Sequence, residues 1–272
     1  MDDERVAAFA SMTERQLSER KLLDGGMFIA EGAKVVRVGL QAGYEPVAFL
    51  TEALHLPDIE ALQETFATDA PVYVGEHAFL TCLSGYNLSR GILCAMRRKP
   101  LSLAADILEG ASRVAVLDGI VEATNVGLLF RSAAALGMDA VLVTPNTCDP
   151  MNRRAMRVSM GNTMLVPWAW TSTLPFNAVL PGPLYQSYLN ALGFRTVAMA
   201  LTDRSIPLDD PALKSERRLA FLLGNEGDGL PDSTIKSADY TVRIPMYHGV
   251  DSLNVAAAAA IAFWELRRQP PY

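Results

Sequence analysis

The chain has 272 residues, half of them hydrophobic, and a mean hydropathy of +0.16. This is enough apolar material for one large domain or two ordinary ones, and it excludes a disordered protein. The formal net charge of −6 argues mildly against a nucleic-acid partner, although a local basic patch can bind phosphate within an acidic protein.

Targeting and metal signals are missing from the sequence. No run of eighteen apolar residues occurs, and the acidic N-terminus lacks an apolar signal core, so we expect neither a membrane span nor a secretory signal. The three cysteines form no Cys-x-x-Cys pair and the three histidines are scattered. We therefore expect a cytoplasmic protein with reduced thiols and no metal site.

Residues 1–104 are expected to form a small α/β domain. Residues 25–43 read as a short strand followed by an amphipathic helix that ends at Gly43. The next predicted elements are a strand, a helix, a strand with a short helix, and a strand, within 45–53, 57–68, 70–85 and 91–99. Lys99-Pro100 interrupts the pattern, and a connector with a short helix follows, so we place a domain boundary near residue 105.

Residues 105–272 are expected to form a doubly wound α/β domain with a parallel sheet. Apolar runs typical of buried parallel strands lie within 113–120, 139–145, 195–202, 218–225 and 239–246. Helical patterns separate several of these runs, and an alanine-rich helix is predicted within 254–269. Ligands of such sheets bind beyond the carboxyl ends of the strands, so the loops there are the places to look for chemistry.

The first of these loops leads into a predicted helix. Asn125 is suited to cap that helix, and Gly127 allows a close backbone approach. Arg131 interrupts an otherwise apolar helix, where a buried guanidinium would need a partner, an anion or a function. The alternative is an arginine that extends to the surface.

The second loop, Gly224-Asn225-Glu226-Gly227-Asp228-Gly229, exposes its backbone and could hold an adenosine or a phosphate. It is neither a dinucleotide fingerprint nor a P-loop, and on its own it is better explained as a glycine-rich hairpin or turn. In the third loop, Asp251 or Ser252 is placed to cap the last helix, with Asn254 in its first turn.

Two basic clusters could contact phosphate. One comprises Arg153, Arg154 and Arg157, and the other Arg97, Arg98 and Lys99. The simpler interpretation of each cluster is a solvated surface.

Taken together, the loops carry N-x-G-x-x-x-R, G-N-E-G-x-G-L and I-P-M-x-x-x-V-D-S-L-N-V-A-x-A in that order, with R-V-S-M-G at 157–161. This set resembles the SpoU (TrmH-like) branch of the SPOUT RNA methyltransferases over residues 112–270. Residues 1–104 are similar to the substrate-binding domain of many SpoU enzymes, which is related to kink-turn-binding ribosomal proteins. One departure is Glu122-Ala123, where the family usually has Asp-Pro.

The resemblance implies a trefoil-knotted catalytic domain that binds S-adenosylmethionine and forms a homodimer through its first and last helices. It implies a catalytic set of Asn125, Arg131, Glu226, Ser252 and Asn254. The implied cofactor-binding set is Leu223, Gly224, Asn225, Gly227, Ile244, Met246, Ser252, Leu253 and Asn254. Arg153, Arg154 and Arg157 would then contact RNA, lining one side of the cleft with Arg131.

The reaction implied is methylation of a ribose 2′-hydroxyl. Arginine stays protonated in proteins, so we assign Arg131 to positioning the target and stabilising alkoxide charge rather than to removing a proton. The extra N-terminal domain favours ribosomal RNA as the target. The alternatives are a transfer-RNA 2′-O-methyltransferase, a non-catalytic RNA-binding ribosome assembly factor and, remotely, a nucleotide-binding oxidoreductase.

Overall fold

The computed structural model describes residues 8–9, 26–84, 91–174, 183–225 and 227–268. By its internal contacts the chain divides into two compact units. Unit 1 comprises residues 1–100 together with 150–165, and unit 2 comprises residues 101–149 and 166–272. Segment 150–165 thus packs with the N-terminal unit although it lies within the second half of the sequence. The assignment of residues 1–104 to substrate binding and of 105–272 to catalysis stays a prediction.

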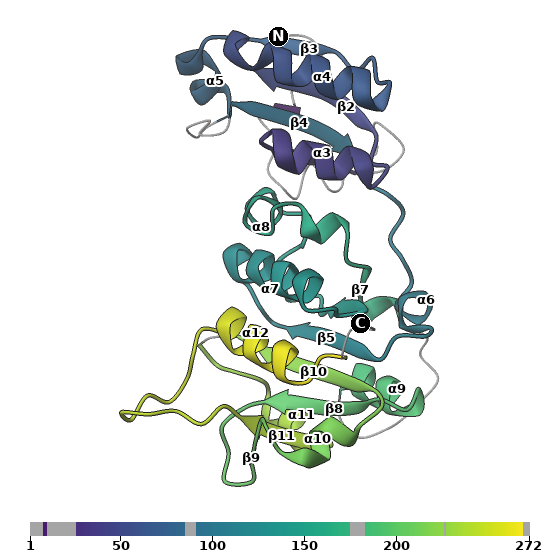
Figure 1. Cartoon of the computed structure of the whole chain (residues 1–272), viewed down its shortest axis with the longest axis vertical. Helices are drawn as coiled ribbons and strands as arrows, with labels where there is room; N and C mark the ends of the chain where they lie inside the picture. Colours follow the sequence, from purple (N-terminus) through teal and green to yellow (C-terminus); the bar gives the residue numbers. More distant parts are fainter. Residues whose placement is uncertain (1–7, 10–25, 85–90, 175–182, 226, 269–272) are drawn as a thin grey trace. The chain divides into compact units, whose positions relative to one another are not determined.

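Unit 1 is built on a four-stranded sheet in the order β1-β4-β2-β3 (Figure 1). Strand β4 pairs antiparallel with β1 and β2, and β3 pairs parallel with β2. Its elements are β1 (Met27–Glu31), α3 (Ala33–Gln41), β2 (Pro46–Thr51), α4 (Leu56–Phe66), β3 (Val72–Val74), α5 (His77–Ser84), β4 (Ile92–Arg97) and α8 (Arg153–Val158). The predicted alternation of strands and helices in this half of the chain is confirmed.

Unit 2 contains a seven-stranded sheet in the order β7-β6-β5-β10-β8-β11-β9, and every neighbouring pair is parallel. The strands are β5 (Arg113–Asp118), β6 (Ala140–Val143), β7 (Trp168–Trp170), β8 (Arg195–Met199), β9 (Ile206–Pro207), β10 (Leu219–Gly224) and β11 (Tyr240–Arg243). The predicted α/β class and the five predicted strands are confirmed. The two strands that the sequence did not predict, β7 and β9, are short and lie at the sheet edges.

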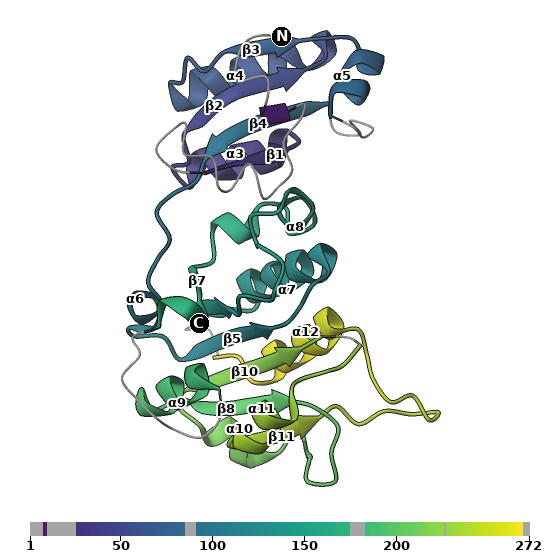
Figure 2. The same ribbon diagram turned by 180° about the vertical axis from the view of Figure 1, so that it is seen from behind.

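Helices cover both faces of this sheet. They are α6 (Ala104–Leu108), α7 (Ala123–Ala135), α9 (Leu184–Ala191), α10 (Pro211–Ser215), α11 (Asp232–Ser237) and α12 (Val255–Glu265). Helices α7 and α12 pack on each other, and the ring of Phe263 in α12 meets the ring of Phe221 in β10 with centroids 5.5 Å apart. Helices α6, α9 and α11 lie on the opposite face (Figure 2). An apolar cluster there includes buried side chains of α6 and α9 and partly buried ones of α11.

Strands β5 and β10 lie side by side at the centre of the sheet. Every residue of both strands is buried, and their register runs from Arg113 opposite Leu219 to Asp118 opposite Gly224. The two strands therefore end together, and this places the loops after β5 and β10 at the same point of the carboxyl edge. Among the described helices, none is long and apolar enough to cross a membrane.

Candidate active site at the carboxyl edge of the parallel sheet

Two asparagines from distant parts of the chain meet at this edge. Asn125 lies in the first turn of α7 and is 6% exposed. Asn254 donates its Nδ2 hydrogen to Asn125 Oδ1 over 3.0 Å. The side-chain hydroxyl of Thr124, beside Asn125, is buried and has no hydrogen-bond partner within the described ranges. The sequence-predicted first and third loops are thus joined by a hydrogen bond between two of their predicted site residues.

The helix caps differ from those that the sequence suggested. Glu122 caps α7 by accepting a hydrogen bond from Thr124 N over 3.3 Å, so the prediction that Asn125 is the cap was wrong. Asn254 caps α12 by accepting a hydrogen bond from Ala256 N over 3.0 Å. Asp251 or Ser252 was therefore the wrong choice for that cap. The difference matters because Asn254 stabilises α12 with its oxygen and holds Asn125 with its nitrogen.

Arg131 lies in α7 and is exposed, which favours the alternative of an arginine that extends to the surface. It lies six positions after Asn125, and at about 100° per residue this spacing turns its side chain away from the buried face that holds Asn125. Within the described part of the chain, Arg131 makes no hydrogen bond or ion pair. Its guanidinium is available to a ligand.

The loop after β10 folds back on the end of its own strand. A Cβ atom on Gly224 would lie 2.4 Å from Leu230 N and 2.5 Å from the Gly229 carbonyl carbon, so only glycine fits there. Asn225 closes the turn by accepting hydrogen bonds from Gly227 N at its side chain and from Gly229 N at its carbonyl, both over 2.9 Å. The close approach expected at Gly224 is thus made by the protein's own backbone.

The other predicted residues of these loops are placed as follows. Leu223 is fully buried in β10. Ile244 and Met246, after β11, are half-buried, whereas Ser252 and Leu253 are exposed. Glu226 lies outside the described residues.

Asp118 and Tyr185 form a buried pair at the same edge that the sequence did not single out. Tyr185 OH in α9 donates to Asp118 Oδ2 over 2.8 Å, and both residues are less than a tenth exposed. Burial, and then the negative charge of Asp118, raise the pKa of Tyr185 well above its ordinary value, so Tyr185 remains a neutral donor. An acidic residue directly after the apolar run 114–117 was the available signal.

Two threonines fix the loop that connects β5 to α7. The hydroxyls of Thr144 and Thr147, which follow β6, both lie 3.0 Å from Gly119 N and accept its hydrogen bond. They also lie 3.2 and 3.0 Å from Leu117 O, to which they can donate. This network holds the start of the loop, and hence the segment that leads to Asn125, against the end of β5.

The basic clusters make internal contacts. In unit 1, Arg157 Nη1 lies 3.2 Å from Glu31 Oε1, and Arg153 Nε lies 3.8 Å from Glu31 Oε2. Glu31 is only 1% exposed, so these arginines neutralise a buried carboxylate. Arg154 is exposed. Since Arg131 belongs to unit 2, a shared surface with these arginines stays a prediction.

The second cluster is likewise used within unit 1. Arg97 pairs with Glu45 over 3.0 Å, and Arg98 donates to Met27 O over 3.3 Å. Lys99 donates to a backbone carbonyl and lies 4.7 Å from the centroid of the Tyr44 ring. The interpretation of this cluster as a phosphate-binding patch has no particular support.

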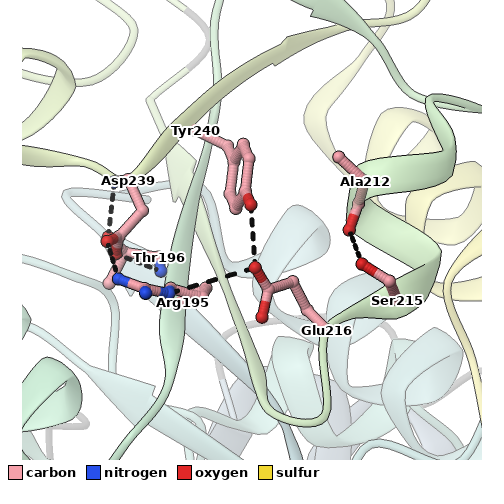
Figure 3. Close-up of polar contacts among 7 residues, drawn as sticks. All are labelled: Arg195, Thr196, Ala212, Ser215, Glu216, Asp239 and Tyr240. Atoms are coloured by element: carbon pink, nitrogen blue, oxygen red, sulfur yellow. Dashed lines mark hydrogen bonds and ion pairs between the residues drawn. The ribbon is translucent and has the colours of Figure 1, made fainter.

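The amino edge of the unit 2 sheet holds a separate polar cluster (Figure 3). Asp239 accepts hydrogen bonds from the backbone and the hydroxyl of Thr196, each over 2.8 Å, and from Arg195 over 2.9 Å. Tyr240 OH donates to Glu216 over 2.8 Å. Arg195 and Tyr240 are the first residues of β8 and β11, so this cluster fixes strand pairing at the end away from the candidate site.

Asp139, directly before β6, likewise fixes strand pairing at the amino edge, here between β6 and β5. Its Oδ2 accepts hydrogen bonds from Ser112 N over 2.8 Å and from Arg113 N over 2.9 Å, at the start of β5. Groups of three or more His, Cys, Asp or Glu side chains that could hold a metal ion do not occur among the described residues.

A family model described as the SpoU rRNA Methylase family matches residues 112–264. The chain is 37% identical over 270 residues to an uncharacterised tRNA/rRNA methyltransferase of Mycobacterium bovis, covering 98% of this chain and 90% of that protein. It is 28% identical over 184 residues to the 23S rRNA (guanosine-2′-O-)-methyltransferase RlmB of Bordetella pertussis, covering 66% of this chain and 71% of that protein.

Solved structures share the fold. The SpoU methyltransferase AviRb of Streptomyces viridochromogenes, crystallised with the cofactor AdoMet, superposes with a TM-score of 0.74 at 19% identity and covers 97% of each chain. An AdoMet-bound rRNA methyltransferase from Sinorhizobium meliloti superposes with a TM-score of 0.72 at 24% identity, covering 88% of this chain and 86% of that one. At these identities the likeness establishes the fold.

Proposed function

The chain belongs to the SpoU rRNA methylase family, and on that premise we propose that it transfers a methyl group from S-adenosylmethionine to a ribose 2′-hydroxyl of RNA. The observation that carries this proposal is the hydrogen bond between Asn125 and Asn254, which joins two family motifs at the carboxyl edge of the sheet. The name of the Bordetella relative supports the 2′-hydroxyl as the acceptor.

The residues at this edge fit the chemistry of S-adenosylmethionine, which combines an apolar adenine, hydrogen-bonding ribose hydroxyls and a sulfonium cation. The edge offers the buried unpaired hydroxyl of Thr124, the buried carboxylate of Asp118 and the exposed apolar side chain of Leu253. Adjacent backbone groups of the loop after β10 complete the proposed site, with Leu223, Gly224, Asn225 and Gly227 on that side. Ile244, Met246, Ser252 and Leu253 belong to its other wall.

Bound S-adenosylmethionine supplies an electrophilic methyl group. The protein must bring the ribose oxygen into line with it, and such positioning alone can account for a large part of the acceleration. Arg131 is exposed and makes no ion pair in the described structure, so we assign it to the target phosphate and ribose. Its fixed positive charge stabilises the oxygen as it loses its proton to solvent or phosphate. Glu226 and Ser252 are proposed members of the same site.

Ribosomal RNA is the proposed substrate, with unit 1 as the kink-turn-protein-like part that recognises it. Arg154 is the exposed member of the α8 arginines. Arg153 and Arg157 pair with Glu31 but stay partly exposed, and they would contact RNA through the exposed part of each side chain. A transfer-RNA substrate is the second candidate, because the mycobacterial relative is named for both RNA classes.

We further propose a knotted catalytic unit, a cytoplasmic location and a homodimer through α7 and α12. The two helices pack together, and α12 leaves Ile261 41% and Trp264 56% exposed. Two large apolar side chains on one helix suit a partner subunit. Sedimentation velocity tests this: the wild type should sediment as a dimer, whereas a wild-type monomer at micromolar concentration would contradict the proposal. Ile261→Glu should weaken the dimer.

The proposed reaction is tested with RNA from cells that lack the gene. Purified protein and labelled S-adenosylmethionine are mixed separately with ribosomal RNA and transfer RNA, and the labelled RNA is hydrolysed with alkali. Because a 2′-O-methyl group blocks alkaline cleavage, the label should appear in an alkali-resistant dinucleotide of ribosomal RNA. Label in transfer RNA would support the second candidate. Cofactor binding without label in either RNA would favour a non-catalytic assembly factor.

A further inference from the structure

We propose that the Asp118 carboxylate is a counter-charge for the sulfonium of bound S-adenosylmethionine, so that the site favours this cation over its neutral product. The inference rests on the proposed function and assigns a role to a residue outside the family motifs described above.

The position of Asp118 is the first argument. It is the last residue of β5 and lies opposite Gly224, the last residue of β10. Residues paired in neighbouring parallel strands point to the same face of a sheet. The backbone of Gly229 and Leu230 crosses directly over that face of Gly224, so the Asp118 side chain emerges beside the loop proposed to hold the cofactor.

The charge of the pair is the second argument. Asp118 is 9% exposed, and Tyr185 donates a hydrogen bond to its Oδ2. Its Oδ1 receives no hydrogen bond from the residues that the structure describes. Because Tyr185 is neutral, the pair as a whole keeps the negative charge of the carboxylate. A buried anion with one neutral partner is compensated only partly, and a cation at this edge would complete the compensation.

The chemistry of the reaction supplies the consequence. Methyl transfer forms the bond between the methyl carbon and the ribose 2′-oxygen, whose proton passes to solvent or phosphate. It breaks the bond between that carbon and sulfur and leaves the bonding electron pair on sulfur, which becomes an uncharged thioether. The attraction between Asp118 and the sulfonium then disappears, so S-adenosylhomocysteine is released more readily than S-adenosylmethionine. With an effective dielectric constant of about 20, opposite charges several ångströms apart change such a preference by roughly tenfold or more.

Isothermal titration calorimetry on the full chain tests the proposal. S-adenosylmethionine and S-adenosylhomocysteine are titrated separately into the wild type, Asp118→Asn and Tyr185→Phe. The amide oxygen of the introduced asparagine would still accept the Tyr185 hydrogen bond, so Asp118→Asn removes mainly the charge. The preference for S-adenosylmethionine should fall by about tenfold in Asp118→Asn. Tyr185→Phe keeps the carboxylate and should keep that preference, even if both affinities decline.

The results distinguish failure of the Asp118 inference from failure of the proposed function. Equal loss of both affinities in Asp118→Asn, with an unchanged preference, would assign the pair a purely structural role and overturn the inference alone. A wild type that binds neither compound would overturn the proposed function and the inference with it. If Asp118→Asn fails to fold by circular dichroism, Asp118→Ser gives the same comparison with a smaller side chain.

Discussion

Replacing Asn254 separates two hydrogen bonds of this side chain. Its Oδ1 accepts from Ala256 N and its Nδ2 donates to Asn125 Oδ1, each over 3.0 Å. Losing an N-cap costs about 1 kcal/mol, and losing a partly buried side-chain hydrogen bond costs about 1 kcal/mol more. Asn254→Ala should therefore lower the free energy of unfolding of unit 2 by about 2 kcal/mol.

Asn254→Ser is the matched control, because serine caps a helix well but is too short to keep the bond to Asn125. It should cost about 1 kcal/mol, half of the loss in Asn254→Ala. Urea unfolding followed by circular dichroism gives both values, and calorimetry should show a melting temperature lowered by roughly 4–8 °C in Asn254→Ala.

A double-mutant cycle isolates the bond between the asparagines. Asn125→Ala and Asn254→Ser, alone and combined, should show a coupling free energy of about 1 kcal/mol. Two results would refute the reasoning. Equal destabilisation by Asn254→Ser and Asn254→Ala would show that the cap contributes nothing, and a coupling free energy near zero would show that the asparagines do not interact.

Three further predictions concern other parts of unit 2. Arg113→Met should destabilise the protein by about 3 kcal/mol in urea unfolding, because the buried guanidinium donates to Leu266 O over 2.7 Å and to other backbone carbonyls. A loss of stability below about 1 kcal/mol would contradict this. Gly224→Ala should cost about 1–3 kcal/mol and weaken cofactor binding, because its Cβ would overlap Leu230 N; unchanged stability and affinity would exclude that packing. Burial alone would raise the pKa of Asp239, but its hydrogen bonds outweigh burial and lower that pKa below its usual 3.8. The Asp239 carboxylate therefore stabilises the fold above about pH 4. This contribution is lost as the pH falls through the folded-state pKa. The stability difference between wild type and Asp239→Asn should thus shrink below about pH 4 in acid titrations, and a constant difference would refute this.

Much of the fold of unit 2 follows from sequence pattern. The central strands are continuous apolar runs, because parallel strands covered by helices on both faces must be apolar on both sides. The short edge strands β7 and β9 escape this logic. Trp168–Trp170 pairs with one neighbour only, and the two residues of β9 are too few to form a pattern. Their pairing is decided by tertiary contacts.

The candidate site could be predicted in residue type but only partly in geometry. Asn125 and Asn254 were singled out, yet their contact spans 129 positions and depends on how α7 and α12 pack. The exposure of Arg131 depends on the rotation of α7, which a mostly apolar helix does not specify. The contact of Glu31 with Arg157 could not be foreseen, because segment 150–165 leaves the unit of its sequence neighbours.

The most direct test of the account is transfer of a labelled methyl group from S-adenosylmethionine to cellular RNA by the wild type, Arg131→Ala and Arg131→Lys. Since Arg131 is exposed and unpaired in the described structure, both variants should keep the wild-type melting temperature. Alkali-resistant label should appear at one site with the wild type, disappear with Arg131→Ala and be strongly reduced with Arg131→Lys. Wild-type rates in Arg131→Lys would refute a role for the guanidinium geometry, and undiminished label with Arg131→Ala would place the catalytic group elsewhere.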